Sequence, residues 1–147
     1  MGMKVCLDTN IFISVKNEED NSPFCEKILD AIDDNRLEAV ISTIVIAEVL
    51  VGFYQNKEDQ EAEKFLSQAM SKYEIIPVNI EIAKKAAEIR GKLKIKLPDA
   101  LISATTIFSK SEILITNDIP LVKKMEYQIL SPTIFVEKFL NSVPIKD

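Results

Sequence analysis

Met3-Lys4-Val5-Cys6-Leu7-Asp8-Thr9-Asn10, near the start of the chain, passes directly from mostly apolar residues to three polar ones. The short apolar run predicts a buried strand over Lys4–Leu7, and the polar cluster marks the point where that strand ends. The next apolar stretch, Ile11–Val15, is too short to be assigned alone, but Asp, Thr and Asn are residues that cap helix starts. The segment therefore predicts a strand that is followed at once by a helix.

The same order of short apolar run and longer amphipathic stretch continues along the chain. Further strands are predicted over Leu37–Ser42, Tyr73–Val78, Ile113–Thr116 and Gln128–Leu130. Helices are predicted over Phe24–Asp34, Ile44–Tyr54, Glu58–Ser71, the stretch that carries Ile82, Ala86, Ile89 and Leu93, Pro98–Phe108, Ile119–Lys124 and Pro132–Leu140. This alternation indicates an α/β fold with a central, mostly parallel sheet of about five strands that is covered on both faces. The length of 147 residues predicts that residues 1–147 form a single domain.

Composition excludes several kinds of chemistry. The chain has no His, which excludes His general bases, His-dependent triads and His-containing metal sites. Its three glycines, Gly2, Gly52 and Gly91, are too far apart to form a phosphate-binding loop. Two cysteines are too few for a four-thiolate zinc site. The 23 Asp and Glu residues are therefore the main groups available for chemistry.

The cysteines and the apolar stretches predict a cytoplasmic protein. Cys6 lies in the first apolar run and Cys25 on a predicted helix, which is typical of reduced, buried thiols. Asp8 interrupts the first apolar run, so the run does not resemble a signal peptide. The longest apolar stretch, Ile44–Val51, contains Glu48 and is much shorter than a membrane span. We therefore expect no membrane association.

Four acidic residues stand out because they adjoin strands or apolar runs rather than polar helix faces. Asp8 and Asp118 each follow a predicted strand, Glu48 interrupts the longest apolar stretch, and Asp99 directly precedes the apolar run Ala100–Ala104. Each also has a structural alternative. A cap or a turn explains Asp8 or Asp118, and the edge of a buried helix explains Glu48. The helix dipole explains an acid at the position of Asp99. Taken alone, each of the four residues is therefore open to a structural and to a functional interpretation.

Together, the four acids indicate a metal-dependent site. Asp8 and Asp118 follow strands, and ligands of open α/β sheets bind in the crevice outside the carboxyl ends of the strands. Glu48 and Asp99 lie near the starts of helices, where they can face the same crevice. Four carboxylates in contact repel one another unless a cation neutralises them. In a chain without His, the cation that fits is a hard one with oxygen ligands, Mg²⁺ or Mn²⁺, and such sites suit phosphodiester hydrolysis.

At these residues the chain resembles the PIN-domain nucleases, in particular the VapC-type toxins of VapBC toxin–antitoxin pairs. The resemblance runs from Val5 to Leu140. It rests on Leu7-Asp8-Thr9-Asn10, on Ser42-Thr43 leading to Glu48-Val49-Leu50, on Pro98-Asp99-Ala100-Leu101-Ile102-Ser103-Ala104 and on Leu114-Ile115-Thr116-Asn117-Asp118. The order, spacing and strand context of these short motifs make a specific set. One departure is Ile119-Pro120-Leu121, because many toxin relatives carry an aromatic residue or His shortly after the last acid.

The resemblance implies a PIN-like α/β/α sandwich and Mg²⁺- or Mn²⁺-dependent endonucleolytic cleavage of RNA. By position, the residues that match the family's catalytic acids are Asp8, Glu48, Asp99 and Asp118. Among them, Asp8, Asp99 and Asp118 match the metal ligands, and Asn10 and Thr116 match polar residues that support the acids. The resemblance also implies a homodimer and, in the toxin branch, a small antitoxin protein that inserts a segment near the acidic pocket.

A basic segment directly before Asp99 is the predicted contact for RNA, although the whole chain has a net charge of −5. Between Lys84 and Lys96 there are six Lys or Arg residues and one acid, Glu88. The last three lysines, Lys92, Lys94 and Lys96, lead into the Asp99 motif, where positive charge can contact the RNA backbone. The alternative for any single lysine is a solvated surface position.

Three other functions compete with that of a toxin ribonuclease. A PIN-type nuclease that processes RNA without being a toxin is distinguished by the neighbouring gene, since a short reading frame for a DNA-binding antitoxin favours the toxin. A catalytically silent PIN-like module that binds RNA or a protein is disfavoured by the complete set of four acids. A phosphatase with Asp8 as its nucleophile is disfavoured because such enzymes usually place a second Asp where this chain has Asn10.

Overall fold

The computed structural model describes residues 2–118 and 128–141 and contains one five-stranded parallel sheet. The strands are β1 (Met3–Leu7), β2 (Leu37–Ser42), β3 (Glu74–Ile76), β4 (Ile113–Ile115) and β5 (Ile129–Leu130). The helices are α1 (Thr9–Lys16), α2 (Ser22–Asp33), α3 (Thr43–Gln55), α4 (Asp59–Lys72), α5 (Ile80–Leu93), α6 (Leu97–Phe108) and α8 (Pro132–Phe135), and α8 continues as the π-helix η1 (Val136–Leu140). The prediction of an α/β fold with about five mostly parallel strands is confirmed.

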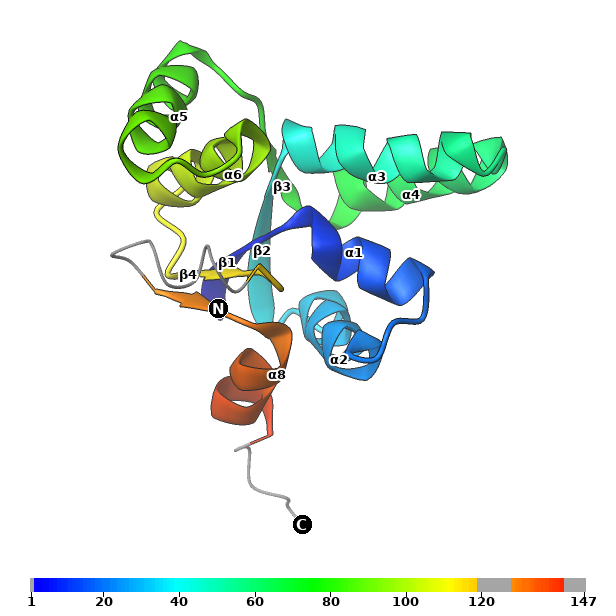
Figure 1. The fold of residues 1–147 in the computed structure, drawn as a ribbon. Helices are drawn as coiled ribbons and strands as arrows, with labels where there is room; N and C mark the ends of the chain where they lie inside the picture. The colour runs from blue at the N-terminus through cyan, green and yellow to red at the C-terminus, as the bar shows by residue number, and fades with distance from the viewer. Residues whose placement is uncertain (1, 119–127, 142–147) are drawn as a thin grey trace.

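The strand order is β3-β2-β1-β4-β5, which places β1 at the centre of the sheet. Figure 1 shows α1 and α2 on one side of the sheet and α5 and α6 on the other, as expected for a sandwich. The pair α3 and α4 projects away from the sheet as an arm, and α8 packs beside α2. All parallel strands end at the same edge of the sheet, so the residues that directly follow β1, β2 and β4 lie near this edge.

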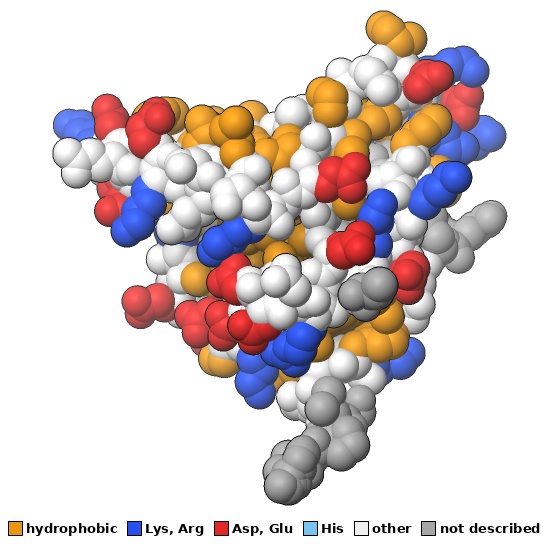
Figure 2. All heavy atoms as spheres, turned by 180° about the vertical axis from the view of Figure 1, so that it is seen from behind, with side chains coloured by type: hydrophobic (Ala, Val, Ile, Leu, Met, Phe, Trp, Pro, Cys, Tyr) orange, Lys and Arg blue, Asp and Glu red, His pale blue; other side chains and the backbone are white. Residues whose placement is uncertain are grey.

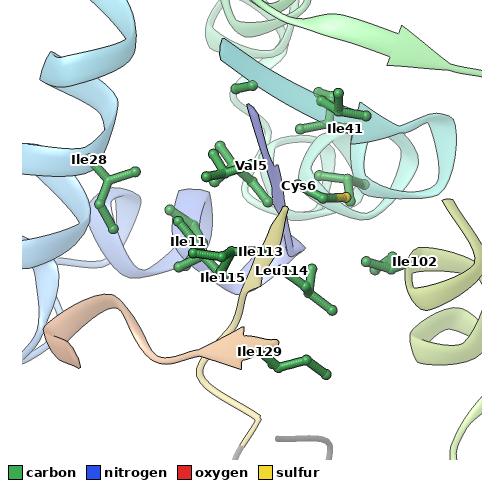
Figure 3. Packing of buried hydrophobic residues seen from close by; sticks show 14 of the residues in the cluster. Val5, Cys6, Ile11, Ile28, Ile41, Ile102, Ile113, Leu114, Ile115 and Ile129 are labelled. Carbon is green, nitrogen blue, oxygen red and sulfur yellow. The ribbon is translucent and has the colours of Figure 1, made fainter. Parts of the chain in front are cut away.

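The strands supply the core through alternating side chains. Figure 3 shows Val5, Ile113 and Ile115 on the side of the sheet that faces α1 and α2, whereas Cys6 and Leu114 lie on the side of α6. All five side chains are buried, because helices cover both faces of the central strands. Cys6 and Cys25 are buried free thiols, as the sequence predicts. Desolvation by burial raises the pKa of the Cys6 thiol to about 12, so this thiol stays protonated.

The predicted limits of the helices and strands agree with the structure except at a few ends, where the local sequence pattern is weak. The strand expected over Tyr73–Val78 pairs with β2 only over Glu74–Ile76, and Pro77, which has no backbone N–H, follows directly. The final helix begins at Pro132 as predicted but changes from α to π geometry at Val136. The short helix expected over Ile119–Lys124 lies outside the described residues. Among the described residues, no helix has both the length and the apolar character needed to cross a membrane.

Candidate functional site

The sheet topology places the expected ligand-binding crevice at the carboxyl ends of β1 and β4. These neighbouring strands run parallel, and the chain leaves β1 toward β2 on one side but leaves β4 toward β5 on the other. Such a reversal of strand order is where open α/β sheets bind their ligands, outside the carboxyl ends of the strands. Asp8 follows β1 directly, and its backbone N–H donates to the carbonyl oxygen of Ile115 at 3.1 Å. Asp118 lies three residues after the end of β4, on the other side of the same crevice.

The carboxylate of Asp8 is buried and fully engaged, with 4% of the residue exposed. Its Oδ1 accepts a hydrogen bond from the backbone N–H of Thr9 at 2.6 Å, which caps α1. Its Oδ2 accepts from the hydroxyl of Thr116 at 2.5 Å and from Nδ2 of Asn10 at 3.2 Å. One oxygen of Asp8 therefore caps α1, as the structural alternative for this residue predicts, whereas the other accepts hydrogen bonds from Asn10 and Thr116.

Asn10 and Thr116 connect Asp8 to the chain that leads to Asp118. Asn10 donates to the Thr116 hydroxyl at 3.3 Å and accepts from the backbone N–H of Asn117 at 3.1 Å. The Thr116 hydroxyl in turn accepts from the backbone N–H of Asp118 at 3.0 Å. The two supporting residues named from the sequence thus hold both sides of the crevice together.

Glu48 and Asp99 reach the site from two helices. Glu48 lies on the exposed side of α3, whose Val45 and Val49 face the core, which agrees with the alternative of a position at the edge of a buried helix. Its Oε1 accepts a hydrogen bond from the hydroxyl of Thr9 at 2.5 Å. Asp99 is half-buried in the first turn of α6. The structure therefore brings residues from β1, α3, α6 and the end of β4 to one place.

The pKa shifts show that the four carboxyl groups interact. Burial raises the pKa of Asp99 to about 6, with further increases from the charges of Asp8 and Asp118, a hydrogen bond with Asp118, and the charge of Glu48. Burial also raises the pKa of Asp8, and the charges of Glu48 and Asp118 add to this effect, whereas hydrogen bonds from Thr116 and Thr9 oppose it. A site with this much negative charge favours a cation.

The donor set fits a hard divalent cation in its chemistry. Carboxylate and amide oxygens are the ligands that Mg²⁺ and Mn²⁺ prefer, and the crevice offers these groups. Within residues 2–118 and 128–141, however, no three His, Cys, Asp or Glu side chains are already arranged to hold a metal ion.

The three predicted RNA-contacting lysines lie on the surface before Asp99. Lys92 is exposed in the last turn of α5, Lys94 follows it as the C-cap with a φ of 58°, and Lys96 is the N-cap residue of α6. They do not reach the acidic crevice as hydrogen-bond partners in the described structure, but the connection they occupy leads into the helix that carries Asp99.

Sequence reasoning missed two side chains that contact the site. The Thr9 hydroxyl orients Glu48, and Asn21 donates from its Nδ2 to Oδ1 of Asn117 at 2.6 Å. Thr9 stands inside the motif that contains Asp8, so its position gave a usable signal. Asn21 gave none, because its partner is 96 residues away in the sequence.

Comparisons with known proteins agree on one family. The PIN domain family model matches residues 5–124. A toxin–antitoxin complex from Klebsiella pneumoniae is similar, with 27% sequence identity and a TM-score of 0.69 over 87% of this chain and 97% of that chain. VapBC2 from Rickettsia felis, solved bound to a DNA fragment from their promoter, has 28% identity and a TM-score of 0.68 over 87% of this chain and 97% of that chain. VapC20 from Mycobacterium tuberculosis, a toxin that cleaves the sarcin–ricin loop, shares the fold at 13% identity, with a TM-score of 0.65 over 84% of this chain and 98% of that chain. No curated protein sequence matches the chain.

Replacement of Asp99 distinguishes a charge cluster from a helix-dipole interaction. Because the folded pKa of about 6 lies above the ordinary value of 3.8, folding stability falls as pH rises through this range. Asp99→Asn should therefore raise the melting temperature in chelator at pH 7.5, and this gain should disappear near pH 4. The matched control is Asp59→Asn, which removes an exposed acid from the first turn of α4 and should slightly lower the melting temperature at pH 7.5. If both variants have a lower melting temperature, the effect of Asp99 on stability comes from the helix dipole alone.

Proposed function

This chain belongs to the PIN domain family, and we propose that it is a metal-dependent endoribonuclease that acts as the toxin of a toxin–antitoxin pair. The observation that carries the proposal is the convergence of four interacting carboxyl groups on the crevice between β1 and β4. The similarity to a toxin–antitoxin complex and to VapBC2 supports the toxin role over that of an RNA-processing nuclease. The proposal places the protein in the cytoplasm, where its RNA substrate is found.

Each residue at the crevice has a proposed role in hydrolysis. Asp8, Asp99 and Asp118 would hold Mg²⁺ or Mn²⁺, which when bound activates water and offsets charge on the phosphate. Thr116 and Asn10 keep one oxygen of Asp8 directed into the crevice. Glu48 is exposed and oriented by Thr9, so its carboxylate is accessible to water and can accept a proton during hydrolysis.

Mn²⁺ should stabilise the protein, and removal of one carboxylate should abolish both the stabilisation and RNA cleavage. When Mn²⁺ is present at about 100 times its Kd, stabilisation should reach roughly 2.7 kcal/mol relative to chelator. Asp8→Asn retains a capping oxygen for α1 but loses a charge, so we expect a folded protein whose cleavage rate falls by orders of magnitude. Asp118→Asn and Glu48→Gln should show the same loss of cleavage.

The control for these variants is Glu63→Gln, which changes an exposed acid on α4 and should leave cleavage unchanged. Because the acids act on one metal site, a double variant should be little worse than either single one. Parental cleavage rates in folded Asp8→Asn and Asp118→Asn proteins would contradict the proposed mechanism, as would a melting temperature that does not respond to millimolar Mn²⁺.

The basic connection between α5 and α6 should affect RNA affinity more than the chemical step. Replacing Lys92, Lys94 and Lys96 together by Ser should weaken RNA binding and reduce the slope of log affinity against log salt by about 0.7 for each lost phosphate contact. Cleavage at saturating RNA should stay near the parental rate.

The control for this prediction replaces Lys27, Lys57 and Lys64, which are exposed elsewhere on the surface. It produces the same net charge, and Lys57 matches Lys94 because both have positive φ values, 59° and 58°. If the two triple variants bind RNA with equal affinity and equal salt dependence, the connection is only a solvated surface.

A cleft between the α3–α4 pair and the α1–α2 pair is the proposed binding site for the antitoxin. It has a volume of about 640 Å³, and its walls include Phe12, Phe53, Phe65 and Tyr73. Phe12 packs edge-on against Phe65 and Tyr73, with ring centroids 5.4 and 5.6 Å apart. The cleft therefore offers apolar surface to a peptide segment.

Charge defines the kind of segment that fits this cleft. Its walls carry five acids, Glu26, Asp30, Asp33, Glu58 and Glu61, but only two lysines. The lysines are already paired, Lys16 with Glu58 at 3.2 Å and Lys72 with Asp33 at 3.1 Å. Figure 2 shows acidic side chains gathered below the α3–α4 arm, toward the region where Figure 1 places α2. The occupant we propose is an antitoxin segment with apolar and cationic side chains.

Charge reversal in the cleft should weaken antitoxin binding without changing catalysis. Asp30→Lys with Glu61→Lys alters two exposed acids of the cleft, so inhibition of RNA cleavage should need at least tenfold more of the proposed antitoxin. Glu81→Lys with Glu112→Lys changes the net charge equally at exposed positions outside the cleft and should leave inhibition unchanged. Equal inhibition of both double variants would exclude this cleft as the docking site.

We also propose a homodimer. Several apolar side chains are exposed on α3 and at the starts of α5 and α6, namely Val51 at 51%, Tyr54 at 47%, Ile80 at 83% and Leu97 at 47%. Exposed apolar side chains of this size support contact with a second copy of the chain, since burial of such surface favours association.

A further inference from the structure

A line of hydrogen-bonded side chains connects α1 and the start of α2 to the end of β4. The hydroxyl of Ser14, which is fully buried on α1, donates to Oδ1 of Asn21. Nδ2 of Asn21 donates to Oδ1 of Asn117 at 2.6 Å. Asn21 is therefore fixed by one partner inside the fold and holds another partner at the edge of the crevice.

The side chain of Asn21 does not cap α2, although its position at the start of the helix favours this role. Asn21 is the N-cap residue of α2, and Asn is among the best N-cap residues, yet its side chain makes no capping hydrogen bond. Asn79 shows the ordinary behaviour at the start of α5, where its Oδ1 accepts from the backbone N–H of Ile82 at 2.9 Å. Asn21 instead directs its amide to Ser14 and Asn117, so the contact with the crevice replaces the cap.

Asn117 is the residue through which this contact reaches the acids. Its backbone N–H donates to Oδ1 of Asn10, whose Nδ2 donates to Asp8. Its side chain is held from the other direction by Asn21. Hydrogen bonds therefore hold both the backbone and the side chain of Asn117, the residue directly before Asp118. The position of Asp118 after β4 depends on both of these contacts.

We propose that Asn21 is a positioning residue that sets the place of Asp118 relative to Asp8. This inference rests on the proposed metal-dependent function, because the distance between the two acids matters for a shared cation. Partners that orient metal ligands typically change metal affinity by about 10- to 100-fold when they are lost. Asn21 acts one residue away from Asp118, through Asn117, so the lower end of that range applies.

The test measures the Mn²⁺ concentration that gives half of the maximal rise in melting temperature, with the full chain and without RNA. Asn21→Ala should raise this concentration about tenfold. Asn21→Ser should raise it similarly, because Ser keeps a good N-cap residue on α2 but is too short to reach Asn117. RNA cleavage by both variants should recover toward the parental rate at saturating Mn²⁺. The matched control, Asn79→Ala, removes a real cap and should lower the melting temperature without moving the Mn²⁺ midpoint.

A double-variant cycle identifies the contact responsible. Asn117→Ala should weaken Mn²⁺ binding as Asn21→Ala does, and the double variant should be no weaker than either single one, because the same Asn21–Asn117 hydrogen bond is lost in each case. Fully additive losses, or an unchanged Mn²⁺ midpoint in both Asn21 variants while the parent responds to Mn²⁺, would overturn the inference. If the parent itself does not respond to Mn²⁺, the proposed metal site fails and the inference fails with it.

Discussion

The burial of the Asp8 carboxyl group is the constraint on which the rest of the site depends. A carboxylate with 4% exposure loses most of its hydration, and nearby Glu48 and Asp118 make its ionisation still less favourable. Three donors offset this cost, the backbone N–H of Thr9, the hydroxyl of Thr116 and the amide of Asn10. Thr116 follows β4, so its hydroxyl reaches Asp8 only because β1 and β4 are neighbours in the sheet. The parallel pairing at the centre of the fold therefore supplies one of the hydrogen bonds that favour the ionised form of Asp8.

The sequence predicts the limits of strands and helices accurately where an apolar run ends in polar residues. The strand over Leu37–Ser42 has the predicted limits, and Ser42 caps α3 through the backbone N–H of Ile44 at 3.1 Å. Asp8 shows the same relation, because it ends β1 and caps α1. Such junctions are encoded locally, since one residue must stop a strand and satisfy the first N–H groups of a helix. The positions of the acids along the chain, and their arrival at one edge of the sheet, follow from these junctions.

Contacts between segments that lie far apart in the sequence cannot be predicted from local residue patterns. The stretch Ile44–Val51 is apolar around most of the helix, so its pattern does not tell which face is buried, and Glu48 lies on the exposed face beside Val51. Asn21 lies in a polar segment between two helices, where nothing local indicates a partner 96 residues away. Both features depend on how α1, α2 and α3 pack, which is a property of tertiary structure. The prediction therefore locates the acids and their partners Asn10 and Thr116, but not the contact that Asn21 makes.

The distribution of charge is compatible with the proposed action on RNA, although the chain has a net charge of −5. Four acidic residues meet at the crevice between β1 and β4, and five others line the cleft between the α1–α2 and α3–α4 pairs. The exposed Lys92, Lys94 and Lys96 occupy a separate connection that leads into α6. A phosphate backbone is repelled by the cleft, attracted by this connection, and tolerated at the crevice only when cations neutralise the carboxylates. A cationic protein segment has the opposite preference, so the proposed substrate and the proposed partner are directed to different surfaces by charge alone.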